Sequence, residues 1–329
     1  MAKKKISKIA VLTSGGDAPG MNATLRAVVR TAIYKKIEVY GIRRGYSGLI
    51  EDDIFLMDSK SVANIIQRGG TVLKSARSEE FKTPEGRKKA YKNLHKRGID
   101  SLIVIGGDGS FTGGLKLSEE HGIAVIGLPG TIDKDCYGTD STIGFDTAVN
   151  TAVECIDKIR DTADAHDRLF IVEVMGRNAG YIALYSGIGT GAETILIPET
   201  NTEIEDVIKG MKSRARRKKL VNLIVVAEGD EFGGATKVAE VIKEALPYLD
   251  TKVTILGHVQ RGGSPTGIDR MLASRMGYHA VLALLEGQNQ IMVGVQNDKI
   301  AYVPLQDAIS KKNQEIDKDL VTMAKVLSY

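Results

Sequence analysis

Short, almost wholly apolar segments recur along the chain, and they limit its fold more than any other feature. Such segments are typical of strands that are buried on both faces, as in a parallel sheet. We therefore predict strands at Ile9–Thr13, Ser101–Ile105, Ala124–Leu128, Leu169–Val174, Asn222–Ala227 and Val253–Leu256.

Amphipathic segments separate these runs. In the clearest of them, apolar residues recur at helical spacing from Phe145 to Ile159. Alternation of strand and helix along a whole chain indicates an α/β fold with helices on both faces of the sheet. The length of 329 residues favours two domains. Ser101–Gly109 resembles Asn222–Asp230, and no linker-like segment is present, so we expect two similar three-layer αβα lobes. Their sheets should be mostly parallel, the chain should cross between them more than once, and the active-site cleft should lie between them.

Composition narrows the class of protein. Glycine accounts for 36 residues, which cluster at strand ends and favour anion-binding turns. The net charge of +4 is too small to indicate nucleic acid, and no aromatic residues interleave the basic run Arg214–Lys219. Two cysteines cannot form a disulfide framework, and no apolar segment is long enough to span a membrane. We expect a cytoplasmic protein that binds small anions and neither nucleic acid nor membrane.

Two glycine-rich turns follow predicted strands. A double glycine, Gly15-Gly16, precedes the first predicted helix, where backbone N–H groups can approach an anion. The alternative is a tight turn without a ligand. Asp108 lies among glycines after the second strand, and one carboxylate among phosphate-binding amides suits Mg²⁺. Alternatively, Asp108 caps the next helix.

A third strand leads into Pro129–Asp135, which carries two acids two residues apart. On an extended segment Asp133 and Asp135 would point the same way and could supply a base and a helper on the metal side. An Asx-rich turn is the alternative.

The second half of the chain places cations at strand ends. Arg168, Arg177 and Arg261 could bind a phosphorylated substrate, with Glu228 and His258 nearby in sequence. Each of these residues could equally have a structural role, the arginines in surface ion pairs and His258 in a hydrogen bond.

Five motifs, in this order, resemble those of the bacterial ATP-dependent 6-phosphofructokinases: LTSGGDAPGMNA, IGGDGS, PGTIDKD, VEVMGRNAG and GHVQRGGSP. The resemblance covers essentially the whole chain. It implies a glycolytic kinase that transfers the γ-phosphoryl group of ATP to the 1-hydroxyl of D-fructose 6-phosphate. It also implies an ATP-binding lobe at 1–143 plus 260–306 and a fructose 6-phosphate-binding lobe at 144–259 plus 307–329.

The resemblance further implies roles for individual residues. Those expected to bind ATP and its Mg²⁺ are Gly15, Arg77, Ser78, Gly107, Asp108, Gly109 and Ser110, with Asp108 as the metal ligand. Asp133 matches the catalytic base, and the other residues expected to serve catalysis are Asp135, Arg77, Arg177, Gly15 and Thr131. Those that match fructose 6-phosphate contacts are Thr131, Asp133, Met175, Gly176, Arg177, Glu228, His258 and Arg261.

Other implied sites involve neighbouring subunits. Arg168 and Lys252 match positions that reach the 6-phosphate from an adjacent subunit, which implies a homotetramer with active sites at its interfaces. Residues that match a site for ADP or a similar nucleotide effector are Arg26, Arg30, Arg160, Gly191, Glu193, Arg217 and Lys219. Lys252, Ser59 and Lys60 depart from the family pattern, which usually has Arg, Arg and Tyr there.

Two other functions remain open on the sequence. A pyrophosphate-dependent phosphofructokinase shares the fold but usually has Asp and Lys at the positions of Gly109 and Gly130. Glycine at both positions is expected to leave room for the α-phosphate and adenosine of ATP. A catalytically silent nucleotide-sensing subunit is the second alternative, and the Asp133/Asp135 pair argues against it.

Overall fold

The computed structural model describes residues 6–164, 168–200, 202–216, 223–311 and 316–328. The chain forms two compact units, each made of two stretches of sequence. Unit 1 comprises Met1–Thr147 and Arg261–Asn313, and unit 2 comprises Ala148–Gln260 and Gln314–Tyr329. The boundaries between the units come after residues 147, 260 and 313, whereas we expected the lobe boundaries after residues 143, 259 and 306.

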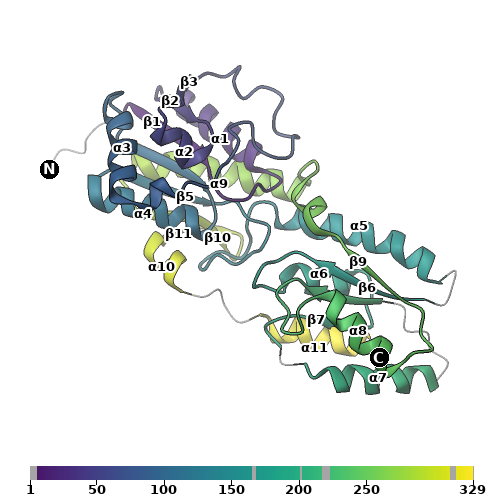
Figure 1. Cartoon of the computed structure of the whole chain (residues 1–329). Coiled ribbons are helices and arrows are strands. Elements are labelled where there is room, and N and C mark those ends of the chain that lie inside the picture. Colours follow the sequence, from purple (N-terminus) through teal and green to yellow (C-terminus); the bar gives the residue numbers. More distant parts are fainter. Residues whose placement is uncertain (1–5, 165–167, 201, 217–222, 312–315, 329) are drawn as a thin grey trace. The chain divides into compact units, whose positions relative to one another are not determined.

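Unit 1 is built on a seven-stranded sheet (Figure 1). Across the sheet the strands are β11 (Lys299–Pro304), β10 (Ile291–Gln296), β5 (Ala124–Pro129), β4 (Ser101–Gly106), β1 (Lys8–Thr13), β2 (Glu38–Ile42) and β3 (Ile54–Met57). Neighbours from β10 to β2 pair in parallel, whereas β11 and β3 are antiparallel edges. Because β1, β4 and β5 are adjacent and parallel, the turns that follow them meet at one edge of the sheet.

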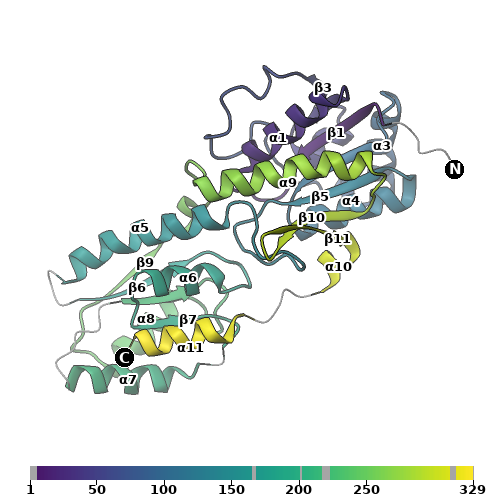
Figure 2. The ribbon, with the colours of Figure 1, turned by 180° about the vertical axis from the view of Figure 1, so that it is seen from behind.

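Helices cover both faces of this sheet because side chains of its central strands alternate between two buried faces. Leu12 and Val104 point into a core with Phe111, whereas Val11 and Ile105 are buried on the opposite face. The first face carries α2 (Gly45–Ile50), α3 (Pro84–His95), α4 (Asp108–His121) and α10 (Leu305–Ser310), with a 3-10 turn η1 (Glu80–Lys82) nearby. The other face carries α1 (Met21–Tyr34) and α9 (Gly267–Leu285), which lie side by side (Figure 2).

Unit 2 has a four-stranded parallel sheet in the order β7 (Thr194–Leu196), β8 (Leu223–Ala227), β6 (Leu169–Val174) and β9 (Thr251–Ile255). One face packs on α7 (Ile204–Arg216) and α8 (Ala235–Ala245). Helix α6 (Tyr181–Gly189) packs on β8 and contacts α11 (Lys318–Leu327). The remaining elements are α5 (Phe145–Asp164), which starts in unit 1 and continues into unit 2, and a 3-10 turn η2 (Gly257–Arg261).

The predicted α/β class with mostly parallel sheets is confirmed, but one prediction about a strand is wrong. The run at Val253–Leu256 was expected to be buried on both faces, yet β9 is an edge strand on which Val253 and Ile255 are exposed. No helix in the described ranges is long and apolar enough to cross a membrane.

Candidate active site

The turns after β1 and β4 lie against each other at the edge of the unit 1 sheet. The backbone N–H of Ser14 donates to the carbonyl of Ile105, 3.0 Å away. A Cβ atom on Gly106 would lie 2.6 Å from the Ser110 hydroxyl oxygen, so only glycine permits this approach. Gly15 has a φ of +84°, and its carbonyl accepts a hydrogen bond from Ser75. Both predicted glycine turns therefore belong to one continuous backbone surface.

Asp108 is the first residue of α4, directly after the turn. The N-cap position belongs to Gly107, which has no side chain, so the alternative that Asp108 is the cap is wrong. The carboxylate instead lies at the positive end of the helix, beside backbone N–H groups. A lone carboxylate in this position fits Mg²⁺ that arrives with a nucleotide, because Mg²⁺ usually takes one or two carboxylates plus phosphate oxygens. In the ranges that the structure describes, no group of three or more His, Cys, Asp or Glu residues is placed to hold a metal by itself.

The loop after β5 approaches the same turn. The N–H of Gly130 donates to the carbonyl of Gly106 at 3.0 Å, and the N–H of Asp133 donates to the Thr131 hydroxyl at 3.2 Å. Asp133 is only 6% exposed, so its carboxylate is largely shielded from water. Thr131, Asp133, Gly107 and Asp108 are thus gathered at one edge of the sheet.

The conformation of this loop differs from the prediction. The chain bends at Ile132 and Asp133, and Lys134 has a left-handed φ of 55°, so the expected extended segment is wrong. The argument that Asp133 and Asp135 point the same way because they alternate along a strand therefore does not hold. The ammonium of Lys134 lies 5.0 Å from the centre of the Phe145 ring.

Cys136 is a site residue that the sequence analysis missed. Its sulfur lies 3.7 Å from Oδ1 of Asp108, and its side chain is fully buried. Burial, with nearby carboxylates as smaller causes, raises the pKa of the Cys136 thiol well above its usual range. The thiol therefore keeps its proton at neutral pH. Its place one residue after Asp135 was the only available signal.

The two glycines expected to leave space for ATP have different surroundings. A Cβ atom on Gly109 would meet no heavy atom within 4 Å, so the space there is open. A Cβ atom on Gly130 would lie 3.1 Å from side-chain atoms of both Ile105 and Met21. A side chain at position 130 would therefore press against core side chains, and the expected room for ATP at Gly130 stays a prediction.

Three further predicted residues lie in unit 1. Arg77 is exposed, and the hydroxyl of Ser78 accepts a hydrogen bond from the Phe81 N–H at the start of η1. Arg261 reaches the first glycine turn: its Nη1 donates to the carbonyl of Asp17 at 3.2 Å. The same guanidinium lies where a Cβ atom on Gly16 would be, at 2.6 Å. The structure thus brings a predicted substrate residue to a predicted nucleotide turn.

In unit 2, the ends of β6 and β8 are joined through Glu228. Its carboxylate accepts the backbone N–H of Arg177 at 2.6 Å. Arg177 has a left-handed φ of 55° and Gly176 a φ of 148°, so the Met175–Arg177 loop turns sharply. Buried Gln260, which the sequence analysis missed, accepts the N–H of Met175.

Arg168 and Lys252 lie together through a residue that was not predicted. Asp250 accepts Nε of Arg168 at 2.8 Å and pairs with Nζ of Lys252 at 2.7 Å. Hydrogen bonds from Lys252 and then Arg168 lower the pKa of the Asp250 carboxyl. The two predicted phosphate ligands therefore share one anion. His258, another predicted substrate residue, lies exposed in η2.

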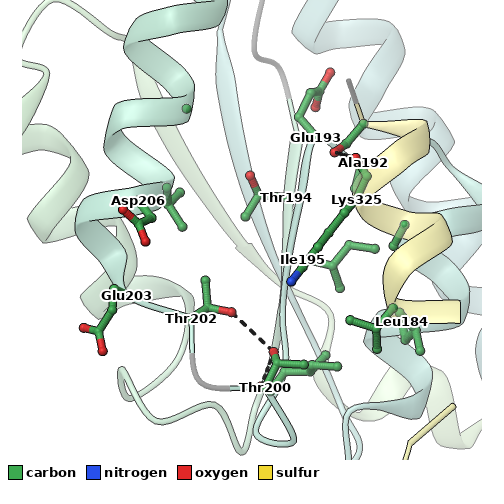
Figure 3. A pocket seen from close by; sticks show the side chains of 16 residues that line it. Leu184, Ala192, Glu193, Thr194, Ile195, Thr200, Thr202, Glu203, Asp206 and Lys325 are labelled. Carbon is green, nitrogen blue, oxygen red and sulfur yellow. Dashed lines mark hydrogen bonds between the residues drawn. The ribbon is translucent and has the colours of Figure 1, made fainter. Parts of the chain in front are cut away.

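Three of the predicted effector residues also meet in unit 2. Arg160 donates to the carbonyls of Thr190 and Gly191 and lies 3.5 Å from Oε1 of Glu193. Glu193 also borders a cavity of about 350 Å³ between α6, β7, α7 and α11 (Figure 3). Arg26 and Arg30 lie one turn apart on α1 in unit 1, and Arg217 and Lys219 lie outside the described residues.

Comparison with known proteins identifies the family. The family model described as phosphofructokinase matches residues 8–284. A protein of Bacteroides thetaiotaomicron named ATP-dependent 6-phosphofructokinase 2 is 53% identical over 320 residues, covering 97% of this chain and 98% of that protein. ATP-dependent 6-phosphofructokinase 1 of Thermus thermophilus is 52% identical, covering 98% and 100%.

Solved structures agree on the fold. Phosphofructokinase of Saccharomyces cerevisiae superposes with a TM-score of 0.86 at 39% identity over 98% of this chain, which spans 47% of the yeast chain. A pyrophosphate-dependent phosphofructokinase of Nitrosospira multiformis gives a TM-score of 0.85 at 23% identity, covering 98% and 91%, and shows the fold alone. With a family match over most of its length and full-length relatives at more than half identity, the chain belongs to the phosphofructokinase family.

Proposed function

We propose that this protein is a glycolytic kinase that transfers the γ-phosphoryl group of ATP to the 1-hydroxyl of D-fructose 6-phosphate, giving fructose 1,6-bisphosphate and ADP. The observation that carries the proposal is the meeting of Asp108, at the start of α4, with the loop of Thr131 and Asp133. Full-length relatives named ATP-dependent 6-phosphofructokinase support the choice of donor. The open space at Gly109 supports it further.

The glycine turns would bind the nucleotide through their backbone. Phosphoryl transfer needs little covalent chemistry from a protein, and positioning with charge stabilisation supplies most of the rate. Gly15, Gly107 and Gly109 present backbone without side chains, and Ser110 lies beside Gly106. Asp108 would hold Mg²⁺, which supplies positive charge to the phosphate oxygens when it is bound. Arg77, exposed in the loop before η1 with Ser78 beside it, would contribute a further cation.

Asp133 would act as the catalytic base. Its carboxylate takes the proton of the sugar 1-hydroxyl while that oxygen forms a bond to the γ-phosphorus and the bond to ADP breaks. The Thr131–Asp133 hydrogen bond holds the loop in which the base lies. Asp135 would assist on the metal side, and Arg177 would balance charge on the transferred group.

The sugar phosphate would be bound largely from unit 2. Met175, Gly176 and Arg177 form a loop whose shape is fixed by Glu228. His258 and Arg261 would add polar contacts. Arg168 and Lys252, held close together by Asp250, would bind the 6-phosphate of a neighbouring subunit's substrate in a homotetramer.

An effector nucleotide such as ADP would bind at a separate site. Its candidate ligands are Arg26, Arg30, Arg160, Gly191, Glu193, Arg217 and Lys219. The cluster of Arg160 with Gly191 and Glu193 supports part of this set, because it places a guanidinium beside a carboxylate that could hold Mg²⁺.

Replacement of the base tests the proposed reaction. We expect Asp133→Ser to keep the fold and ATP binding but to lower kcat by roughly 10²- to 10⁴-fold, the usual contribution of a positioned base. The measurement is the steady-state rate of fructose 1,6-bisphosphate formation, with nucleotide binding as the control. Turnover near that of the unsubstituted enzyme would rule out Asp133 as the base.

A further inference from the structure

Cys136 lies on the boundary between the hydrophobic core of unit 1 and the proposed metal site. Its side chain is completely buried and belongs to the apolar cluster that contains Phe111, Val303 and Leu305. The sulfur nevertheless lies 3.7 Å from Oδ1 of Asp108, within the range of a hydrogen bond that involves sulfur. One side chain therefore contacts the core and the carboxylate at the start of α4.

In this contact the Cys136 thiol is the hydrogen-bond donor and the Asp108 carboxylate is the acceptor. A thiol that is shielded from water stays protonated and can donate, whereas a carboxylate accepts. A hydrogen bond to an ionised acceptor is stronger than one between neutral groups. Asp108 is half-buried between Gly107 and Gly109, at the start of α4. A donor at fixed distance from Oδ1 restricts rotation of that carboxylate.

We propose that Cys136 is a positioning residue whose thiol orients the Asp108 carboxylate for the Mg²⁺ carried by the nucleotide. The inference rests on the proposed function, in which Asp108 is the metal ligand. It requires no contact between Cys136 and the ion, since Mg²⁺ prefers oxygen ligands and the thiol is buried in the core. Partners that orient a ligating carboxylate typically change metal affinity by roughly 10- to 100-fold. A thiol is a weak donor, so we expect the effect at or below the lower end of this range.

Two substitutions separate orientation from packing. Cys136→Ala removes the donor and leaves a small cavity, whereas Cys136→Ser keeps a hydroxyl donor at the same position. Both variants lose the sulfur, and serine fills slightly more of its space than alanine, so the donor is the main difference between them. Cys136→Val, which has no donor but fills the space, provides a second donor-free variant if the alanine protein folds poorly.

The readout is binding of ADP to the full chain by calorimetry, once with Mg²⁺ and once with EDTA. The ratio of the two dissociation constants reports the metal's contribution and is insensitive to a general loss of stability. We expect Cys136→Ala and Cys136→Val to lower the preference for the Mg²⁺ complex by about three- to tenfold. Cys136→Ser should retain most of it, and metal-free ADP should bind all variants equally.

Asp108→Ala distinguishes failure of the inference from failure of the proposed function. Loss of the metal preference in Asp108→Ala with no change in Cys136→Ala and Cys136→Val would overturn the positioning role alone. Equal losses in the serine and alanine variants would also overturn it, because the donor would then be irrelevant. No change in Asp108→Ala would remove the metal assignment itself, and the inference with it.

Discussion

A carboxylate at position 109 should weaken ATP binding without harming the fold. A Cβ atom on Gly109 would meet no heavy atom within 4 Å, so Gly109→Asp introduces no steric clash. The new residue would lie in the first turn of α4, where a negative charge interacts favourably with the helix dipole by about 0.3–1 kcal/mol. We therefore expect the thermal stability of the variant to equal or slightly exceed that of the unsubstituted protein.

The added negative charge should weaken binding of the nucleotide. A carboxylate and an α-phosphate charge about 5 Å apart repel each other by about 3 kcal/mol at an effective dielectric constant of ~20. This corresponds to a dissociation constant raised roughly 150-fold, and screening by salt and Mg²⁺ reduces the expected change to between about 10- and 150-fold. The assay is calorimetric titration with Mg²⁺ and a non-hydrolysable ATP analogue.

Gly109→Asn is the matched control, because asparagine has nearly the shape of aspartate without its charge. We expect the asparagine variant to bind ATP within about threefold of the unsubstituted protein, since its uncharged side chain lacks the repulsion between like charges. If Asp and Asn weaken binding equally, the cause is steric and the open space at Gly109 is not where the nucleotide lies. If neither weakens binding, the ATP site is elsewhere.

Three other predictions concern Asp250, Asp269 and the response to ADP. Asp250→Asn removes the anion that competes with phosphate for Arg168 and Lys252, so half-saturating fructose 6-phosphate should fall about two- to fivefold in steady-state kinetics. Because the pKa of the Asp250 carboxyl is lowered, this group is ionised at neutral pH. The effect of the substitution should therefore be constant from about pH 6 to 9 and disappear only as acid protonates the carboxylate. A rise in half-saturating fructose 6-phosphate would refute the competition. Asp269→Ala leaves the buried N–H groups of Gly144 and Thr147 without their acceptor. This substitution should lower the free energy of unfolding, measured by urea titration, by about 3 kcal/mol, and a change below about 1 kcal/mol would contradict the prediction. ADP should change half-saturating fructose 6-phosphate by less than about tenfold, because Ser59 and Lys60 lack the guanidinium and the ring that are usual in the family. A much larger shift that Arg160→Ala abolishes would show that positions 59 and 60 do not limit the effect of ADP.

The strands that could be predicted are those buried by helices on both faces. β1, β4, β5, β6 and β8 lie close to the predicted bounds, because a doubly covered strand must be apolar at nearly every position. The strands that were not predicted are β2, β3, β7, β10 and β11. Only Val303 of β11 is buried, because a strand at the sheet edge tolerates polar residues. β10 is an exception, since it is apolar and almost wholly buried and was nevertheless missed. β9 carries apolar residues at an edge, so an apolar run did not guarantee burial.

The turns of the site were predictable because glycine patterns are local. The double glycine after β1 and the glycines around Asp108 could be interpreted without knowledge of distant residues. The contacts of Cys136 with Asp108 and of Asp250 with Arg168 join residues 28 and 82 positions apart, and no local pattern signals them. The left-handed conformation of Lys134 was equally hidden, because a lysine seldom adopts it.

The choice of phosphoryl donor is the central claim, and initial rates on the unsubstituted protein test it most directly. Fructose 6-phosphate is supplied with Mg²⁺ and either ATP or pyrophosphate, and fructose 1,6-bisphosphate is measured. The account predicts rapid formation with ATP and, with pyrophosphate, a rate at least about a hundredfold lower, the loss that goes with about 2.7 kcal/mol of transition-state binding. Equal rates with the two donors, or product with pyrophosphate alone, would contradict it.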